Sequence, residues 1–250
     1  MTGVIRVGIG GWTYEPWRGL FYPKGLPHKQ ELAHAAAKLT SIEINGTYYS
    51  TFRPPTWAKW RDETPPGFVF SVKASRYCTN RKILAEAGEA VTRFINQGLA
   101  ELGDRLGPIN WQFMASKKFD LVDFEAFLRL LPREIKGLPL RHALELRSPT
   151  FKTERFYDLA RRHKVALCFA DDDDFPVLDE TTTDFTYARL MRTQDQIPAG
   201  YSAPDLDRWA AKAKEWAGRG DTFIYFISGA KHRAPAAAEA LIERVGRPAA

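Results

Sequence analysis

The chain has 250 residues, of which 44% are hydrophobic and 26% are charged, with 36 lysines and arginines against 30 aspartates and glutamates. This composition excludes a collagen, a coiled coil and a disordered chain, and the length is sufficient for one large hydrophobic core. The net charge of +6 favours anionic partners in general. Because the basic residues are dispersed along the chain, the charge permits nucleic-acid binding without indicating it.

The sequence indicates neither a membrane helix nor a cysteine motif. No apolar run reaches the roughly 18–20 residues of a membrane helix, and the N-terminus lacks the apolar core of a signal peptide. The two cysteines, Cys78 and Cys168, form no CxxC pair, which argues against a disulfide scaffold and a structural zinc site. We therefore expect a cytoplasmic protein without a membrane partner, and the pattern indicates no particular oligomeric state.

Eight short runs rich in β-branched and aromatic residues alternate with helix-like segments. The predicted strands lie at residues 4–13, 41–48, 68–74, 108–114, 141–147, 165–171, 185–191 and 222–228. The predicted helices lie at residues 31–39, 56–62, 87–102, 121–131, 153–162, 205–217 and 234–245, with a weak one around 175–183. Such alternation is typical of βα units that build a parallel sheet.

This number of strands predicts an α/β fold, a single (β/α)8 barrel of the TIM type, which usually takes about 250 residues. A doubly wound open sheet is the main alternative, but it usually has fewer strands and a nucleotide-binding loop. The glycines at 8–11 are not followed directly by a helix, so they do not match that loop. We predict one domain over residues 1–250, with a long loop after the first strand. That loop contains the aromatic residues Tyr14, Trp17, Phe21 and Tyr22.

The polar residues of the predicted strands fall on one parity. In a barrel, alternate side chains point inward, and the others must be apolar because helices cover them. Glu43 and Asn45, for example, alternate with Ile42 and Ile44. By this alternation we expect a charged group at the C-terminal mouth, where barrel enzymes have their sites. Its members are Glu43, Glu145, Asp171, Lys73, Arg147 and Arg189, joined at the same end by Asn45, Tyr48, Gln112 and Tyr187.

In the sixth predicted strand, the acidic residue Asp171 is the basis for predicting which side chains point inward. Asp171 shares its parity with Leu167 and Phe169, so an inward Asp171 would turn Cys168 toward the helices. Charges buried at the mouth must pair with one another, with water or with a ligand, because an unpaired one costs several kcal/mol. A structural salt-bridge network that plugs the barrel is one interpretation. We favour a polar pocket, because this mixture of groups suits sugars, nucleosides or phosphate esters.

Several motifs together resemble the DUF72 (YecE-like, UPF0759) family of TIM-barrel proteins. They are GIGGWTY at 8–14, IEINGTYY at 42–49, FSVKA at 70–74, LGDRLGP at 102–108, ELR at 145–147 and YARL at 187–190. The resemblance implies a TIM-type barrel without an established reaction, in a family likened to sugar isomerases and to metal-dependent barrel nucleases. The family often continues Glu-x-Arg with His and places Asn near the end of the eighth strand. This chain has Ser148 and Ile227–Ser228 there, so no role is carried over for that His or Asn.

We therefore expect an enzyme that acts on a small polar or anionic ligand by acid/base chemistry at the mouth. The ligand classes are a sugar, a sugar phosphate or a nucleotide fragment. The expected catalytic residues are Glu43, Glu145 and Asp171, with Glu145 or Glu43 as the general acid/base. Lys73, Arg147 and Arg189 would hold an anion or stabilise negative charge. The other expected ligand-binding residues are Trp12, Asn45, Tyr48 and Gln112.

Two alternatives stay open at this point. The first is a metal-dependent isomerase-like or nuclease-like enzyme with a divalent metal on the three carboxylates, which the adjacent basic residues disfavour because like charge repels a cation. A His-rich zinc centre is not indicated, and no other cofactor is predicted. The second alternative is a non-catalytic barrel that binds nucleic acid or protein through its basic surface. His232, with Lys231 and Arg233, follows the eighth predicted strand and is a further candidate for anion binding.

Overall fold

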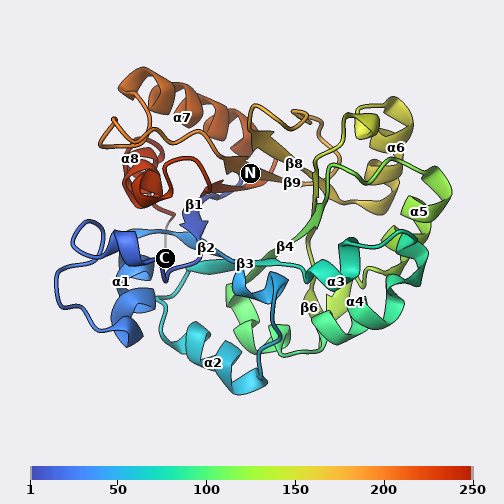
Figure 1. Ribbon diagram of the computed structural model, residues 1–250, viewed down its shortest axis with the longest axis horizontal. Coiled ribbons are helices and arrows are strands. Elements are labelled where there is room, and N and C mark those ends of the chain that lie inside the picture. The colour runs from blue at the N-terminus through green and yellow to red at the C-terminus, as the bar shows by residue number, and fades with distance from the viewer. Residues whose placement is uncertain (1, 249–250) are drawn as a thin grey trace.

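Eight parallel strands close into a barrel in the computed structural model, which describes residues 2–248 (Figure 1). They are β1 (Ile5–Gly10), β2 (Ser41–Ile44), β3 (Val69–Lys73), β4 (Leu106–Phe113), β7 (His142–Leu146), β8 (Ala166–Asp171), β9 (Phe185–Leu190) and β10 (Asp221–Phe226). Strand β1 pairs with both β2 and β10, which closes the barrel. The predicted TIM-type barrel is confirmed, and each predicted strand overlaps one observed strand.

Helices surround this barrel on its outer face (Figure 1). They are α1 (Glu31–Lys38), α2 (Pro54–Asp62), α3 (Arg76–Thr79), α4 (Gly88–Ile95), α5 (Leu121–Leu130), α6 (Glu154–His163), α7 (Ala203–Ala217) and α8 (Ala234–Val245). Side-chain caps mark where some of them begin: Asp120, Thr153 and Ser202 each accept a backbone N–H of the first turn. The longest, α7, has 15 residues, and within residues 2–248 no helix meets the requirements of a membrane span.

The helix predicted at 87–102 is shorter than expected, because the chain turns at Gly98. That glycine has φ of 132°, a conformation that residues with a side chain rarely adopt. Helix α4 therefore ends at Ile95, and a 3-10 segment, Leu99–Arg105, leads into β4. The weak helix predicted around 175–183 is not helical. A small hairpin of β5 (Glu134–Ile135) and β6 (Leu138–Pro139) was not predicted.

The apolar residues form two layers, one inside the barrel and one between the barrel and the helices. The inner layer consists of Val69, Ala143, Ala166, Cys168, Phe185, Tyr187, Phe223 and Tyr225. In the outer layer, Trp111 of β4 packs against Phe94 of α4 and Phe127 of α5. Its indole N–H donates to Nδ1 of the buried His142 at 3.0 Å. Polar side chains on the inward parity share the interior of the barrel with this inner layer.

Strand β8 corrects one prediction. Cys168 lies inside the barrel, whereas Phe169 packs on Trp209 and Trp216 of α7, with ring centroids 5.9 and 5.2 Å apart. Asp171 shares the outward parity of Phe169, and Arg192 pairs with it at 3.3 Å. The expectation failed because β8 is apolar on both faces until its last residue. Size decides its direction locally, since the side chains of Arg189 and Glu145 meet across the inward face of β8 and leave room there only for alanine and cysteine, whereas Phe169 packs on α7.

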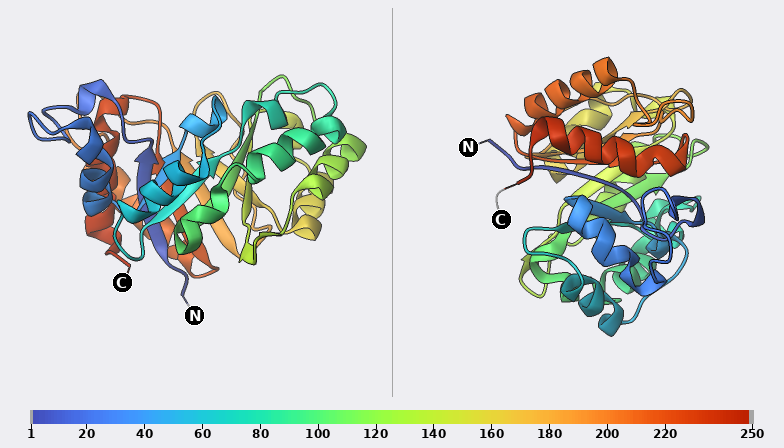
Figure 2. Two further views of the ribbon diagram at one scale, coloured as in Figure 1. Left: turned by 90° about the horizontal axis from the view of Figure 1, so that it is seen from below. Right: turned by 90° about the vertical axis from the view of Figure 1, so that its left-hand side faces the viewer.

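Both termini lie at one end of the barrel (Figure 2). The strands run from that end to the opposite one, where the loops after each strand gather. Several 3-10 segments lie in these loops, among them η1 (Glu15–Trp17), η3 (Gly46–Tyr48), η6 (Pro149–Phe151) and η7 (Lys231–Arg233). The carboxyl ends of the strands and these segments form the mouth of the barrel. The polar inward side chains of β2, β3, β4, β7 and β9 lie near this mouth.

Candidate functional site

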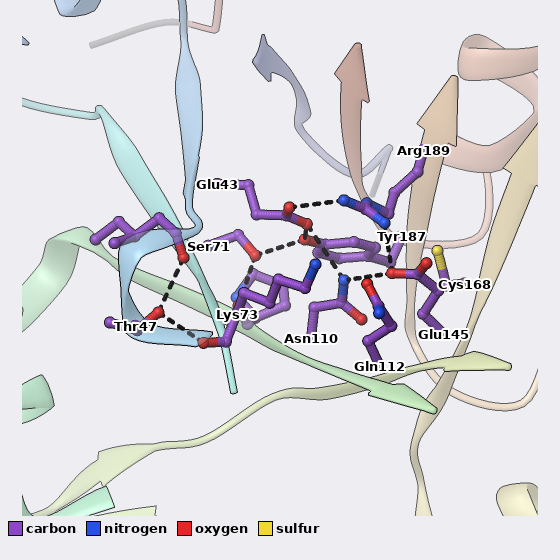
Figure 3. A network of polar contacts seen from close by, with 12 residues as sticks. Glu43, Thr47, Ser71, Lys73, Asn110, Gln112, Glu145, Cys168, Tyr187 and Arg189 are labelled. Atoms are coloured by element: carbon purple, nitrogen blue, oxygen red, sulfur yellow. Dashed lines mark hydrogen bonds and ion pairs between the residues drawn. The ribbon is translucent and has the colours of Figure 1, made fainter. Parts of the chain in front are cut away.

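A buried ionic network forms the floor of the mouth (Figure 3). Arg189 of β9 donates from Nη1 to Glu145 of β7 at 2.5 Å and from Nη2 to Glu43 of β2 at 3.2 Å. The three side chains are exposed by 3% or less. A single guanidinium therefore links two carboxylates, Glu43 and Glu145, that lie far apart in the sequence.

Every oxygen of the two carboxylates has a hydrogen-bond partner. On Glu43, Oε2 accepts from the Tyr187 hydroxyl at 2.5 Å and from Asn110 Nδ2 at 3.3 Å. On Glu145, Oε2 also accepts from Asn110 Nδ2, at 3.2 Å, and Oε1 accepts from Arg147 Nε and Nη2 at 2.9 and 2.7 Å. These donors compensate for the loss of hydration that burial imposes on both carboxylates.

The electrostatics of the network keep Glu145 ionised. Burial by itself would raise its pKa, but the positive charges of Arg189 and Arg147, with a further contribution from Lys73, lower the pKa of Glu145 to about 2. The opposite holds for Tyr187, whose pKa is raised by burial and by the charge of Glu43. Near neutral pH Glu145 is thus a carboxylate and Tyr187 a neutral phenol, and neither group exchanges protons readily.

A cavity of about 580 Å³ opens above this floor, within the size range of small-molecule sites. Its charged lining residues are Lys73, Arg147, Arg189 and Lys231, and its aromatic ones are Trp12, Trp17, Tyr49, Phe52, Trp60 and Phe226. No aspartate or glutamate is among the lining residues described for it. The cavity therefore presents positive charge and aromatic surface to a ligand.

The structure brings most of the predicted site residues together. Glu43, Glu145 and Arg189 lie in the floor, and Gln112 accepts from Arg147 Nη2 at 3.1 Å. The walls of the cavity include Trp12, Asn45, Lys73, Arg147 and Arg189. Tyr48 is buried, and its ring lies under the amine of Lys73.

Asp171 does not join this group, contrary to the prediction. It lies on the outward parity of β8, in contact with Arg192 and with the hydroxyl of Tyr201 at 3.4 Å. Its pKa is raised, mainly by burial. The charged cluster of the mouth thus contains two carboxylates rather than three, and Asp171 belongs to a separate ion pair next to it.

Lys73 is a titratable group of the mouth whose pKa is shifted toward neutral pH. Its Nζ lies 4.6 Å from the ring centroid of Tyr48. Burial is the main cause that lowers its pKa, to about 8, and Arg189 and Arg147 lower it further against the opposing charges of Glu43 and Glu145. Its backbone is held by the Thr47 hydroxyl, which donates to the Lys73 carbonyl at 2.6 Å (Figure 3).

Two contributors were underrated by the sequence analysis. Asn110 bridges Glu43 and Glu145, and its inward parity with Gln112 was the signal that could have identified it. Lys231 lines the cavity with its Nζ 4.2 Å from the Tyr14 ring centroid. Of the basic triplet after β10, only Lys231 does so, because His232 and Arg233 both contact Asp195.

The donor set of the mouth does not fit a divalent metal. Within residues 2–248 there is no group of three His, Cys, Asp or Glu side chains placed to bind one ion. The two carboxylates that do converge are both engaged by arginines. A hard cation needs several carboxylate or carbonyl oxygens that face it, whereas this floor turns guanidinium groups toward the same oxygens.

Comparisons with known proteins agree with this architecture. A family model described as "Protein of unknown function DUF72" matches residues 6–250. A DUF72 family protein from Thermotoga maritima superposes with a TM-score of 0.75 at 26% identity, over 95% of this chain and 96% of that one. A second, from Enterococcus faecalis, has a TM-score of 0.74 at 15% identity, with 97% and 95% covered.

A more distant likeness concerns the fold alone. A D-psicose 3-epimerase, solved in the presence of D-fructose, superposes with a TM-score of 0.51 at 12% identity, over 97% of this chain and 90% of that one. At such low identity the superposition reports a shared barrel and does not transfer a reaction. A search of curated proteins found no match.

Proposed function

The chain belongs to the DUF72 family, and from that premise we propose that it is an enzyme that binds a small anionic molecule in the mouth cavity and transfers protons through Lys73. The observation that carries this proposal is the lining of the cavity, which has four cationic side chains and, among the residues described for it, no carboxylate. Sugar phosphates and nucleotide fragments combine the required charge with faces that stack on aromatic rings.

The cations have different parts in this proposal. Arg147 is half-buried, with Nη2 held between Glu145 and Gln112, and its planar guanidinium suits a phosphate or a carboxylate. Arg189 is fixed by two carboxylates, so it contributes a constant positive charge at the floor. Lys231 adds a second amine to the cavity wall. Together these groups would neutralise an anion and stabilise negative charge that develops on it.

Lys73 is the group best suited to proton transfer. A general acid or base works best when its pKa is near the working pH, and the pKa of Lys73 is lowered to about 8. That of Glu145 is lowered to about 2, which does not favour the general acid/base role expected from the sequence. In our proposal Glu43 and Glu145 are positioning residues that hold Arg189 and Arg147.

Calorimetric titration with inorganic phosphate near neutral pH tests the binding step. We expect binding to the wild type that weakens by about tenfold or more in Arg147→Met, because a hydrogen bond between charged groups contributes about 1.5–3 kcal/mol. Arg129→Met is the matched control, since Arg129 is 70% exposed and pairs with Glu125 on its own helix. Equal affinities in all three proteins, or no binding to the wild type, would overturn the proposal.

Nucleic-acid binding is a second candidate, supported by the rim of the cavity. Arg76 lies 5.7 Å from the ring centroid of Tyr49 and 5.5 Å from that of Tyr77. These rings are exposed by 64% and 62%, and Tyr49 also lines the cavity. Bases of a single strand stack on such surfaces. The protein should then bind a labelled oligonucleotide with steep salt dependence, and Tyr77→Ala should weaken this binding. Binding that changes neither with added salt nor in Tyr77→Ala would exclude this candidate.

A further inference from the structure

Within residues 2–248 the amine of Lys73 has no acidic partner, although it is largely buried beside two carboxylates, and Lys231 is the other lysine of the cavity lining. Among the residues that the structure describes, no ion pair to Lys73 is found, and its Nζ lies over the ring of Tyr48, 4.6 Å from the centroid. Lys117 is a useful contrast: its side chain is 13% exposed, and its Nζ lies 2.6 Å from Asp123. The two carboxylates near Lys73, on Glu43 and Glu145, are already occupied by arginines.

Cationic neighbours act on this amine from two sides of the barrel. Arg189 of β9 and Arg147, just after β7, disfavour its protonated form, while Glu43 of β2 and Glu145 of β7 favour it. Burial tips the balance toward the neutral amine. With a pKa near 8, about a fifth of the molecules carry a neutral amine at pH 7.4, against about 0.1% for a lysine with its ordinary pKa. A desolvated lysine beside another cation is a recognised form of activated nucleophile.

The backbone of Lys73 is held in place at the edge of the cavity. Its carbonyl accepts the Thr47 hydroxyl at 2.6 Å, and the next residue, Ala74, donates its N–H to the Asn110 carbonyl at 2.8 Å. The side chain extends from the end of β3 toward the network (Figure 3) and lines the same cavity as Arg147 and Lys231. A molecule whose anionic group lies on Arg147 or Lys231 can therefore present a second group to the Lys73 amine.

We propose that Lys73 is a covalent nucleophile that forms a Schiff base with an aldehyde or ketone that carries a phosphate or carboxylate group. In this step the neutral amine attacks the carbonyl carbon and a carbon–nitrogen bond forms. The nitrogen gives up a proton as the oxygen takes one, which yields a carbinolamine. The hydroxyl group then leaves with one further proton as water, and a protonated imine remains on Lys73. This inference rests on the proposed function, because the anionic group is what directs the carbonyl compound into the cavity.

Reductive trapping of the full-length protein tests the inference. The protein is incubated with dihydroxyacetone phosphate or, separately, with pyruvate, and sodium borohydride then delivers hydride to the imine carbon to give a stable secondary amine. Trypsin does not cut after a modified lysine, so an adduct on Lys73 appears on the peptide 62–76 instead of 62–73. We expect this peptide to dominate the labelled products and to diminish when inorganic phosphate competes.

Variants and a binding measurement separate the possible failures. Lys73→Arg keeps the positive charge but has no amine that forms an imine, so it should lose the adduct and still bind phosphate, whereas Lys117→Arg should retain the adduct. Mapping on the wild type remains decisive even if Lys73→Arg fails to fold. Labelling spread over exposed lysines, or no adduct in a protein that binds phosphate, overturns the Schiff base and leaves the proposed function intact. Absence of phosphate binding overturns the proposed function itself.

Discussion

The guanidinium of Arg189 on β9 donates to the carboxylate of Glu145 on β7 at 2.5 Å, although β8 lies between these two strands in the barrel. The inward residues of β8 are Ala166, Cys168 and Ala170, all of them small. Their size leaves room for two long side chains to meet across the strand. This contact, together with the one to Glu43, ties together three strands of the barrel and fixes the positive floor of the cavity.

Removal of one carboxylate from this network should destabilise the fold. In Glu145→Gln, Arg189 and Arg147 each lose a charged partner in a buried place, and breaking a buried ion pair typically costs about 3–5 kcal/mol. Urea unfolding should therefore show a clearly lower midpoint. Glu125→Gln is the control, since Glu125 pairs with Arg129 on the surface of α5, where such pairs contribute at most about 1 kcal/mol. A Glu145→Gln protein as stable as the wild type would contradict this view of the network.

His142 should make stability sensitive to mild acid. It is buried, Trp111 donates to its Nδ1 at 3.0 Å, and its Nε2 lies 2.7 Å from the Pro132 carbonyl. Burial lowers the pKa of His142 from 6.5 to about 4, so the fold favours the neutral ring. The contribution of the neutral ring to the free energy of unfolding is complete above pH 6.5. It is lost as the pH falls from 6.5 toward 4, and the loss is roughly 3 kcal/mol at most.

Unfolding free energies measured between pH 7 and pH 4 check this expectation. In His142→Asn the amide oxygen can replace Nδ1 as an acceptor for Trp111 without titrating. The variant should be less stable than the wild type at pH 7, and the difference should shrink as the pH falls. Parallel pH profiles for the two proteins would show that His142 is not the group responsible.

Glu145 should govern a second loss of stability at lower pH. The pKa of this group is lowered from 4.5 to about 2, so the folded state favours its ionised form. The contribution of the ionised Glu145 to the free energy of unfolding is present above pH 4.5 and is lost as the pH falls from 4.5 toward 2. Acid unfolding of the wild type should therefore include a component in this range that Glu145→Gln lacks. An identical slope in both proteins below pH 4.5 would count against the assignment.

The reactivity of Lys73 should follow pH with a midpoint near 8. Only the neutral amine reacts with acylating reagents, and burial together with Arg189 and Arg147 lowers the pKa of Lys73 to about 8 against Glu43 and Glu145. Competitive labelling with acetic anhydride, read by mass spectrometry of the peptide that contains Lys73, measures the midpoint. A midpoint near 10.5 would mean that the amine is not activated, and it would remove the basis for proton transfer by this residue.

Asp171→Asn should leave the cavity unchanged. Asp171 faces away from the network and pairs with Arg192, which is 47% exposed, so its loss should cost less than about 1 kcal/mol. The affinity for inorganic phosphate should stay within about twofold of the wild type, in contrast to Arg147→Met. A large loss of affinity in Asp171→Asn would restore Asp171 to the site.

Much of the fold and part of the site can be predicted from the order of residue types. Alternation of polar and apolar residues predicts the inward direction of Glu43, Gln112, Glu145 and Arg189 because each lies in a strand whose other face must be apolar against the helices. The same logic fails for β8, where both faces are apolar and only the space available to Phe169 and Cys168 selects the direction.

What each charge does was decided by the tertiary structure alone. The sequence itself determines that the strands form a barrel and that acids and bases gather at its mouth, since these follow from period and order along the chain. The sequence does not determine that Arg189 pairs with both Glu43 and Glu145 while Lys73 pairs with neither of them. Those pairings depend on distances between strands far apart in the chain, and a pKa is set by such distances and by burial rather than by residue type.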